Sequence, residues 1–235
     1  MAANGTLEMF SPVNLIGNVT GWQFQTGGGE REAFDRSQEL KDDGDELMSA
    51  LTNGKKTATL NFVSTLSTGK ISWPAVGSHA NGWHIDQVRI TWNRGQIRPK
   101  MAVTVHKHTS GTMHSTCRTY ASTLSGQIDA QAFGCPSVFG TAFALDANSV
   151  AAMRTATLTV TANHVDEPNG SGGNLMGDNH DGSETLEVEL TGKSITYTST
   201  WDRTDNGDEP SNTGATTTSM TFEHHIAHTV AQAGS

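Results

Sequence analysis

The residue type in this chain that is best suited to metal binding and acid–base chemistry is histidine, of which there are ten. Three of them, His224, His225 and His228, form an H-H-x-x-H motif in which the first and last would share one face of a helix, as metal ligands often do. However, residues 219–224 alternate as a strand does, and on a strand His224 and His225 point to opposite faces. We therefore do not expect them to chelate a metal together.

A second group lies in the middle of the chain, where His106 and His108 share a strand face and His114 is nearby. No carboxylate or cysteine is fixed close to them in the sequence. For both groups a surface or interface role is favoured over a metal site. The sequence therefore predicts no bound metal.

Two acidic segments, 178–184 (DNHDGSE) and 202–209 (DRTDNGDE), could supply hard oxygen ligands for calcium. Neither has the D-x-[DN]-x-[DN]-G frame followed by the glutamate of a calcium loop. Asp, Asn and Gly are also the residues that tight turns require, so turns are favoured and calcium is the alternative. The candidate donors are Asp178, Asp181, Glu184, Asp202, Asp205, Asn206, Asp208 and Glu209.

Enzyme signatures are missing from the sequence. It contains no G-x-S-x-G nucleophile motif, and neither of the common glycine-rich phosphate loops occurs. We therefore expect a protein that is not an enzyme and that uses no cofactor. A metal-dependent hydrolase centred on His224, His225 and His228 is the minority alternative.

Five tryptophans could serve as packing or as contact residues. Trp92 and Trp201 end alternating segments, where large rings commonly close a core. Trp73 and Trp83 stand in turn-rich sequence and are the better candidates for an exposed contact with a sugar or with another subunit, while a packing or interface role is favoured for the tryptophans as a group.

The composition limits the function classes further. The 235 residues carry a formal net charge of -9, which disfavours a general nucleic-acid binder, and only 34% of them are hydrophobic. The N-terminus lacks the basic region of a signal peptide, and no stretch approaches the roughly 18 apolar residues of a membrane span. Cys117 and Cys135 could pair, but two reduced thiols are favoured.

Short alternating segments separated by Gly, Pro and Asn-rich breakers predict a mainly β protein, a β-sandwich or barrel-like pair of sheets in one domain spanning residues 1–235. Residues 1–50 are expected to form an N-terminal arm and an acidic connection, with a short helix near 45–52 or an extended chain as alternatives. Residues 107–150 are expected to be an irregular excursion with a short helix near 144–153. The predicted strands are 55–64, 84–92, 101–106, 154–163, 185–190, 194–201 and 219–224.

The run FQTGGGEREAFDRSQELKDDGDELMSALTNGKKTATLNFV resembles a segment of the tail-tube and related virion proteins of tailed bacteriophages. In both, a polar arm leads to an acidic turn, then to N-G-K-K and a strand with alternating Thr. The resemblance covers about the first 65 residues and, more loosely, residues 155–225, where SETLEVELTGKSITY fits the same description. Residues 107–150 have no counterpart.

The resemblance implies a β-sandwich flanked by a helix. It also implies that copies of this subunit assemble into rings, commonly hexameric, and that the rings stack into a tube. An acidic lumen would let DNA pass without specific binding. The implied partners are other copies of the chain and other virion proteins, with no membrane, and the location is the virion, assembled in the host cytoplasm. The loop GSGGNLMGDNHDG and the arm GGGEREAF are expected to order only on assembly. Expected assembly or lumen contacts are Asp42, Asp43, Asp45, Glu46, Trp73 and Trp83.

Two alternatives stay open. One is another phage structural protein, such as a decoration, collar or capsid-associated protein. The other is a secreted carbohydrate-binding or adhesin β-sandwich that uses exposed tryptophans.

Overall fold

The computed structural model describes residues 21–40, 46–80, 83–108, 119–124, 128–169, 173–192, 195–205 and 217–226. Strands dominate these residues, and the fold is mainly β and β-sandwich-like, as the sequence predicts. No helix in this part of the chain is long and apolar enough to cross a membrane.

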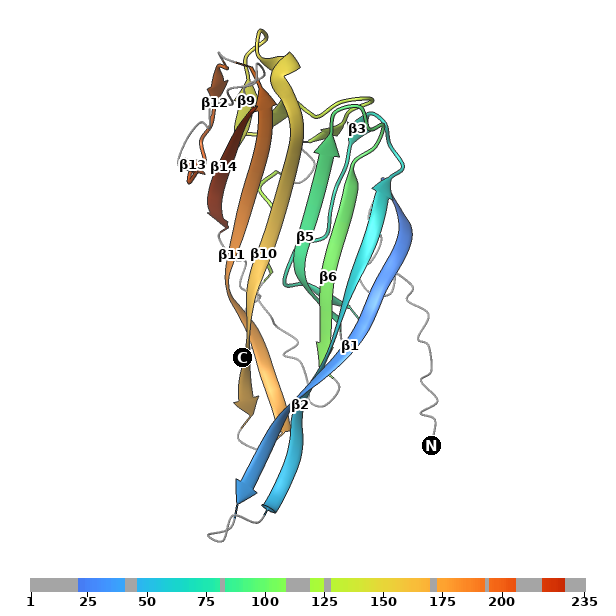
Figure 1. Cartoon of the computed structure of the whole chain (residues 1–235), viewed down its shortest axis with the longest axis vertical. Coiled ribbons are helices and arrows are strands. Elements are labelled where there is room, and N and C mark those ends of the chain that lie inside the picture. Colours follow the sequence, from blue (N-terminus) through green and yellow to red (C-terminus); the bar gives the residue numbers. More distant parts are fainter. Residues whose placement is uncertain are drawn as a thin grey trace, which may run out of the picture.

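One large antiparallel sheet organises the described residues (Figure 1). Its strand order is β1-β2-β6-β5-β10-β11-β14-β13, and β4 pairs with β5 to make the ninth strand. The strands are β1 (Trp22–Leu40), β2 (Glu46–Ser64), β4 (His79–Ala80), β5 (Trp83–Asn93), β6 (Lys100–His108), β10 (Met153–Asn169), β11 (Gly173–Thr191), β13 (Asp202–Arg203) and β14 (Thr217–Ile226).

The alternation of the sequence decides which side of this sheet is buried. On β2, Leu60 and Phe62 are buried while Asn61 between them is partly exposed, and β14 buries Met220 and Phe222 in the same way. Side chains of a strand point alternately to its two faces, so these residues place one apolar face toward the core. The opposite face carries mainly Thr, Asn and charged side chains.

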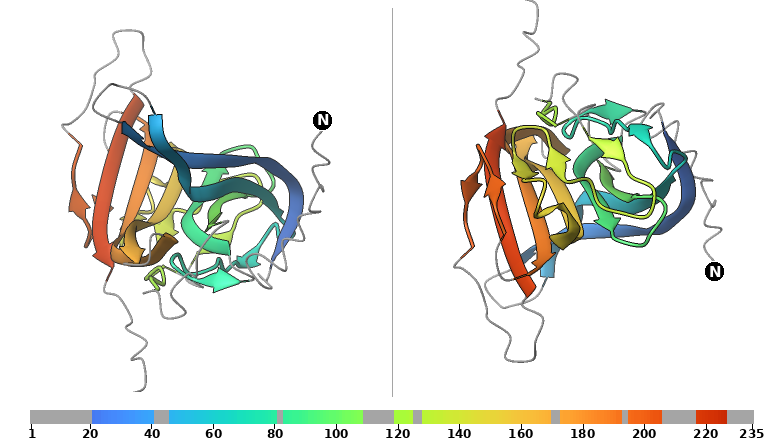
Figure 2. Two further views of the ribbon diagram at one scale, coloured as in Figure 1. Left: turned by 90° about the horizontal axis from the view of Figure 1, so that it is seen from below. Right: turned by 90° about the horizontal axis from the view of Figure 1, so that it is seen from above.

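A second layer of short strands and loops covers the apolar face. Phe139 packs edge-on against Trp92 with ring centroids 5.3 Å apart, and Phe143 lies 5.4 Å from Phe222. Seen along the long axis, the β10–β11–β14 part and the β1–β2–β6–β5 part of the sheet lie at an angle to each other (Figure 2). The covering elements are β3 (Gly69–Lys70), β7 (Asp129–Ala130), β8 (Val138–Phe139), β9 (Phe143–Leu145), β12 (Tyr197–Thr198) and a 3-10 helix at Val150–Ala152.

Two hairpins extend beyond the rest of the sheet. β2 pairs with β6 from Lys55 to Val63. Among the described residues, the part of the β1–β2 hairpin that extends from the Ala33–Lys55 pair to the tip has no strand pairing other than that between β1 and β2. The β10–β11 hairpin also extends beyond its neighbours. The pairing of β10 with β5 ends at Thr161, and the pairing of β11 with β14 ends at Gly182. We call these extensions the first and second ribbons. Both project from the same end of the molecule (Figure 1).

The ribbons correct two predictions. The short helix considered near residues 45–52 is wrong for the described part, because β2 begins at Glu46; the extended alternative holds there. The segment GGGEREAF, expected to order only on assembly, lies within β1. Of the loop GSGGNLMGDNHDG, for which the same was expected, residues 173–182 lie within β11, and residues 170–172 lie outside the described residues. The Gly and Asn residues that suggested loops are accommodated in strands with several register shifts.

Two further predictions are corrected in part. Segment 194–201 was predicted as a strand, but only Tyr197–Thr198 pairs, on the edge of a small sheet. The short helix expected near 144–153 is a single 3-10 turn at Val150–Ala152.

Candidate functional site

The strand order brings three histidines together at one place on the sheet. His84 on β5 pairs directly with His106 on the neighbouring strand β6. Strand β10 lies on the other side of β5, where Thr161 pairs with Gln87. His164 follows three residues later on β10. Ring centroids are separated by 4.9 Å for His84 and His106, 4.6 Å for His84 and His164, and 4.4 Å for His106 and His164.

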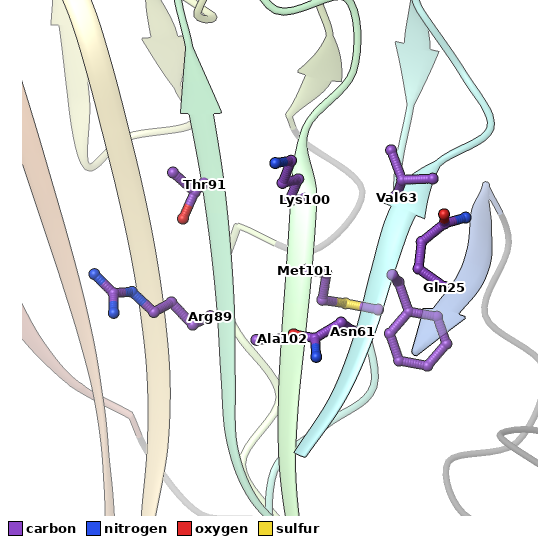
Figure 3. Close-up of a pocket in the computed structure, with 9 residues that line it drawn as sticks. Gln25, Asn61, Val63, Arg89, Thr91, Lys100, Met101 and Ala102 are labelled. Carbon is purple, nitrogen blue, oxygen red and sulfur yellow. The ribbon is translucent and has the colours of Figure 1, made fainter. Parts of the chain in front are cut away.

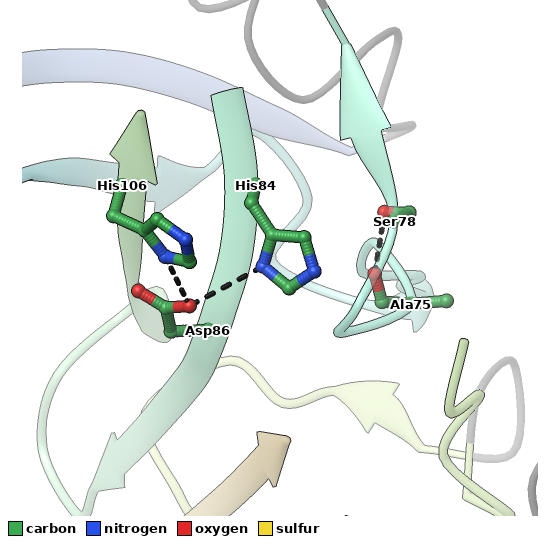
Figure 4. A network of polar contacts seen from close by, with 5 residues as sticks. All are labelled: Ala75, Ser78, His84, Asp86 and His106. Carbon is green, nitrogen blue, oxygen red and sulfur yellow. Dashed lines mark hydrogen bonds and ion pairs between the residues drawn. The ribbon is translucent and has the colours of Figure 1, made fainter. Parts of the chain in front are cut away.

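A β-bulge adds a carboxylate to this histidine cluster. Ile85 pairs with Val105 and Gln87 with Thr104, so Asp86 is the extra residue on β5. Its Oδ1 lies 2.6 Å from Nδ1 of His106 and 3.3 Å from Nδ1 of His84, and both rings turn this nitrogen toward it (Figure 4). Bulges often re-aim side chains beside functional sites.

Burial sets the electrostatics of the cluster. His84 and His106 are fully buried, and His164 is half-buried. Burial disfavours ionisation of Asp86, but hydrogen bonds from His106 and His84, together with their attraction, outweigh this and hold its pKa well below the usual range. A charged carboxylate therefore sits against two buried imidazoles.

The predicted surface or interface role is wrong for His106, because its side chain is fully buried. His108 is the last residue of β6, and the structure describes its backbone only, whereas His114 lies outside the described residues. His84, His164 and Asp86 were missed. The local signal was H-x-D at positions 84 and 86, which places both side chains on one strand face. His164 is far away in sequence and could only be found from the strand order.

The C-terminal histidines behave as the strand pattern predicts. His224 is half-buried and stacks on Trp201 with ring centroids 5.4 Å apart, whereas His225 is exposed. His224 Nδ1 lies 3.3 Å from Oε2 of the buried Glu184. His228 lies outside the described residues.

Residues 178–184 lie within strand β11, so the turn predicted there is wrong, and two carboxylates of the acidic segments, Glu184 and Asp205, make internal contacts. Both carboxylate oxygens of Glu184 accept hydrogen bonds from Thr123, one from its N–H at 2.9 Å and one from its hydroxyl at 2.8 Å. Asp205 accepts two hydrogen bonds from the guanidinium of Arg203, each at 2.7 Å. These contacts agree with structural roles rather than calcium binding for Glu184 and Asp205. Asn206, Asp208 and Glu209 lie outside the described residues.

The structure describes three of the six predicted assembly or lumen contacts, namely Trp73, Trp83 and Glu46. Trp73 and Trp83 are only 6% and 3% exposed, so the prediction that they are exposed is wrong; their rings belong to the core. Asp42, Asp43 and Asp45 lie outside the described residues, between the last residue of β1 and the first of β2. Glu46 begins β2, and its Cα pairs with Leu40.

Cys135 is a free cysteine whose Sγ donates to the carbonyl of Arg154 at 3.3 Å. Burial raises the pKa of this thiol to about 11, although the positive charge of Arg94 acts against the shift. Cys117 lies outside the described residues.

The polar face of the sheet holds two shallow grooves with different charges. The larger, of about 560 Å³, has Arg89 and Lys100 as its only charged lining residues (Figure 3). The smaller, of about 270 Å³, runs over β10, β11 and β14 and is lined by Glu187, Glu189 and several Thr and Ser residues. We call them the basic groove and the acidic groove.

The chain matches no family model, and no curated protein matches it either.

Proposed function

We propose that this protein is a structural subunit of a virion, and more specifically a tail-tube subunit that assembles with copies of itself into stacked rings. The two ribbons carry this proposal. An isolated two-stranded ribbon is marginally stable in water, and each of its edges offers a row of backbone groups for further pairing. Contacts with neighbouring copies would stabilise the ribbons and use these edges.

Charge complementarity supports a specific contact between copies. The second ribbon, residues 162–169 and 173–181, contains Asp166, Glu167, Asp178 and Asp181 and no Lys or Arg. The basic groove carries the opposite charge in Arg89 and Lys100. We assign this groove to the second ribbon of the next copy. Such a head-to-tail contact uses two different surfaces of the chain and generates a ring when the rotation closes.

The acidic groove is assigned to the lumen. Glu187 and Glu189 are its charged residues, and it lies on a Thr-rich face of the sheet. With the net charge of -9, such a surface would repel DNA phosphates and let the genome pass without specific binding. Other virion proteins would contact the ends of the tube.

The burial of the tryptophans argues against the carbohydrate-binding alternative. This alternative requires tryptophans exposed for stacking on sugar rings, whereas all five are buried, at 9% exposure or less. The assembly hypothesis requires none of them at the surface.

Negative-stain microscopy and light scattering of the concentrated protein test the proposal. We expect rings or tubes. The register allows the second ribbon to be shortened cleanly, because Val165 pairs with Asp178, so an Asn-Gly turn can replace residues 166–177. This variant should keep the thermal unfolding of the parent and lose assembly.

A charge exchange tests the assigned contact itself. Arg89→Glu with Lys100→Glu should abolish assembly, and adding Asp166→Lys with Glu167→Lys should restore it. A compact monomer at high concentration would overturn the proposal. Rings that never stack would favour a collar or decoration protein over a tail tube.

A further inference from the structure

We propose that His84, His106 and His164 form a binding site for one zinc ion. The three rings come from three adjacent strands, β5, β6 and β10, and each offers a nitrogen within 4.8 Å of the others. Imidazole nitrogen is a preferred zinc ligand, and three histidines with an open fourth position make a common zinc site.

Asp86 prepares two of these rings for metal binding. A neutral imidazole has one donor and one acceptor nitrogen. Because Asp86 Oδ1 faces Nδ1 of both His84 and His106, the proton of each ring belongs on Nδ1, and the lone pair is on Nε2. A carboxylate behind a histidine ligand is the usual outer contact of a zinc site, where it fixes the tautomer and makes the ligand more basic.

The spacing of the rings suits a small ion. Zinc–nitrogen distances of about 2.0–2.1 Å in a tetrahedral site place the nitrogens about 3.3 Å apart. The nitrogens of the cluster are within 4.8 Å of one another. Side-chain rotations that move each nitrogen by about 1 Å would therefore bring all three to coordination distance from the ion. The partial exposure of His164 gives a route for the ion and a place for a water ligand in the fourth position.

The donor set favours zinc over calcium or magnesium. Those hard cations prefer oxygen ligands, whereas this cluster offers three nitrogens and holds its carboxylate oxygen against the imidazoles.

The position of the site suggests what zinc would do. It would join β6, β5 and β10 close to where the ribbons leave the sheet, since β2 and β6 last pair at Lys55 and His108 and β10 leaves β5 at Thr161. The ion would therefore fix the bases of the two ribbons relative to each other.

Zinc titration of the full-length protein after chelator treatment tests the inference, with metal content measured by mass spectrometry. We expect one zinc ion per chain and a higher unfolding temperature in zinc. Cobalt substitution should give the intense visible bands of a tetrahedral site. Asp86→Asn should weaken zinc binding roughly 10- to 100-fold, the range for an outer-sphere partner.

Two ligand variants and one control complete the test. His106→Gln and His164→Gln should each lose stoichiometric zinc, and the half-exposed His164 makes the second variant the safer one for folding. His225→Gln, an exposed histidine on β14, should bind zinc as the parent does. Absence of saturable zinc uptake, or uptake that survives His164→Gln in folded protein, would overturn the inference. This outcome is independent of whether the protein forms rings.

Discussion

The ring of Tyr120 lies directly against the backbone of Gly182, so that a Cβ atom at this glycine would be 2.4 Å from Cγ of the ring. Gly182 lies at the base of the second ribbon, where its Cα pairs with Ala162 on one side and with Ile226 on the other. Tyr120 is held by a pair of backbone hydrogen bonds with Val76. The covering layer and the large sheet therefore meet without room for a methyl group.

Gly182→Ala should destabilise the protein by about 1–3 kcal/mol, the usual cost of overpacking a core. The measurement is urea unfolding followed by tryptophan fluorescence. In a Tyr120→Leu background the same substitution should cost clearly less, because the ring that it meets is gone. Gly134→Ala is the matched control, since no atom lies within 4 Å of the added methyl group, and it should have little effect. Equal losses at both glycines would contradict the packing argument.

The second stability prediction concerns the buried carboxylate of Glu184. Glu184 is fully buried, and each of its carboxylate oxygens accepts a hydrogen bond from Thr123. Glu184→Gln replaces one carboxylate oxygen with an amide NH2, so the amide oxygen can still accept from the N–H of Thr123 while the NH2 donates to its hydroxyl. Because the hydroxyl must reverse its role and the geometry must readjust, we expect a loss of about 0.5–1.5 kcal/mol, the net range for an ordinary hydrogen bond.

Glu187→Gln serves as the control for this prediction because Glu187 is exposed on the same strand. Its effect should stay within about 0.5 kcal/mol. If the two variants unfold at the same urea concentration, the contacts with Thr123 do not stabilise the fold.

The third prediction concerns the pH dependence of thiol reactivity. The thiolate is the reactive form of cysteine, and burial raises the pKa of Cys135 from 9.0 to about 11. In a Cys117→Ser background, modification of native Cys135 at pH 8 should be about 100-fold slower than that of an ordinary thiol. The rate should rise about tenfold per pH unit and level off only near pH 11.

Unfolded protein provides the internal reference for this measurement. In urea the same thiol should react at the rate of an exposed cysteine. A native rate that levels off near pH 9 would show that the thiol is not shielded.

Local alternation was enough to predict most of the sheet. Residues such as Leu60 and Phe62 on one face and Asn61 on the other are a signal that needs no tertiary information. The ribbons were missed because Gly and Asn normally mark turns, and here long antiparallel pairing overrides that preference. Trp73 and Trp83 were misplaced for a related reason: Trp73 lies in an irregular segment that is buried in the core, and Trp83 is the first residue of strand β5.

The histidine cluster shows what a sequence pattern cannot supply. His84 and Asp86 are close in sequence, but His106 and His164 reach them only through the strand order β6-β5-β10. That order is non-local information. Only the H-x-D pair was accessible to sequence analysis.

The acidic groove leads to the last prediction. If Glu187 and Glu189 keep DNA from adhering to a lumen, the parent protein should not bind a fluorescent DNA duplex at physiological salt. Glu187→Lys with Glu189→Lys should bind it, with an affinity that falls steeply as salt is added, because binding would release counterions from the phosphates. Asp129→Lys with Asp202→Lys makes the same change in net charge at exposed positions elsewhere. Fluorescence anisotropy should detect binding for the first pair alone; equal binding by both pairs would mean that net charge, and not the acidic groove, excludes DNA.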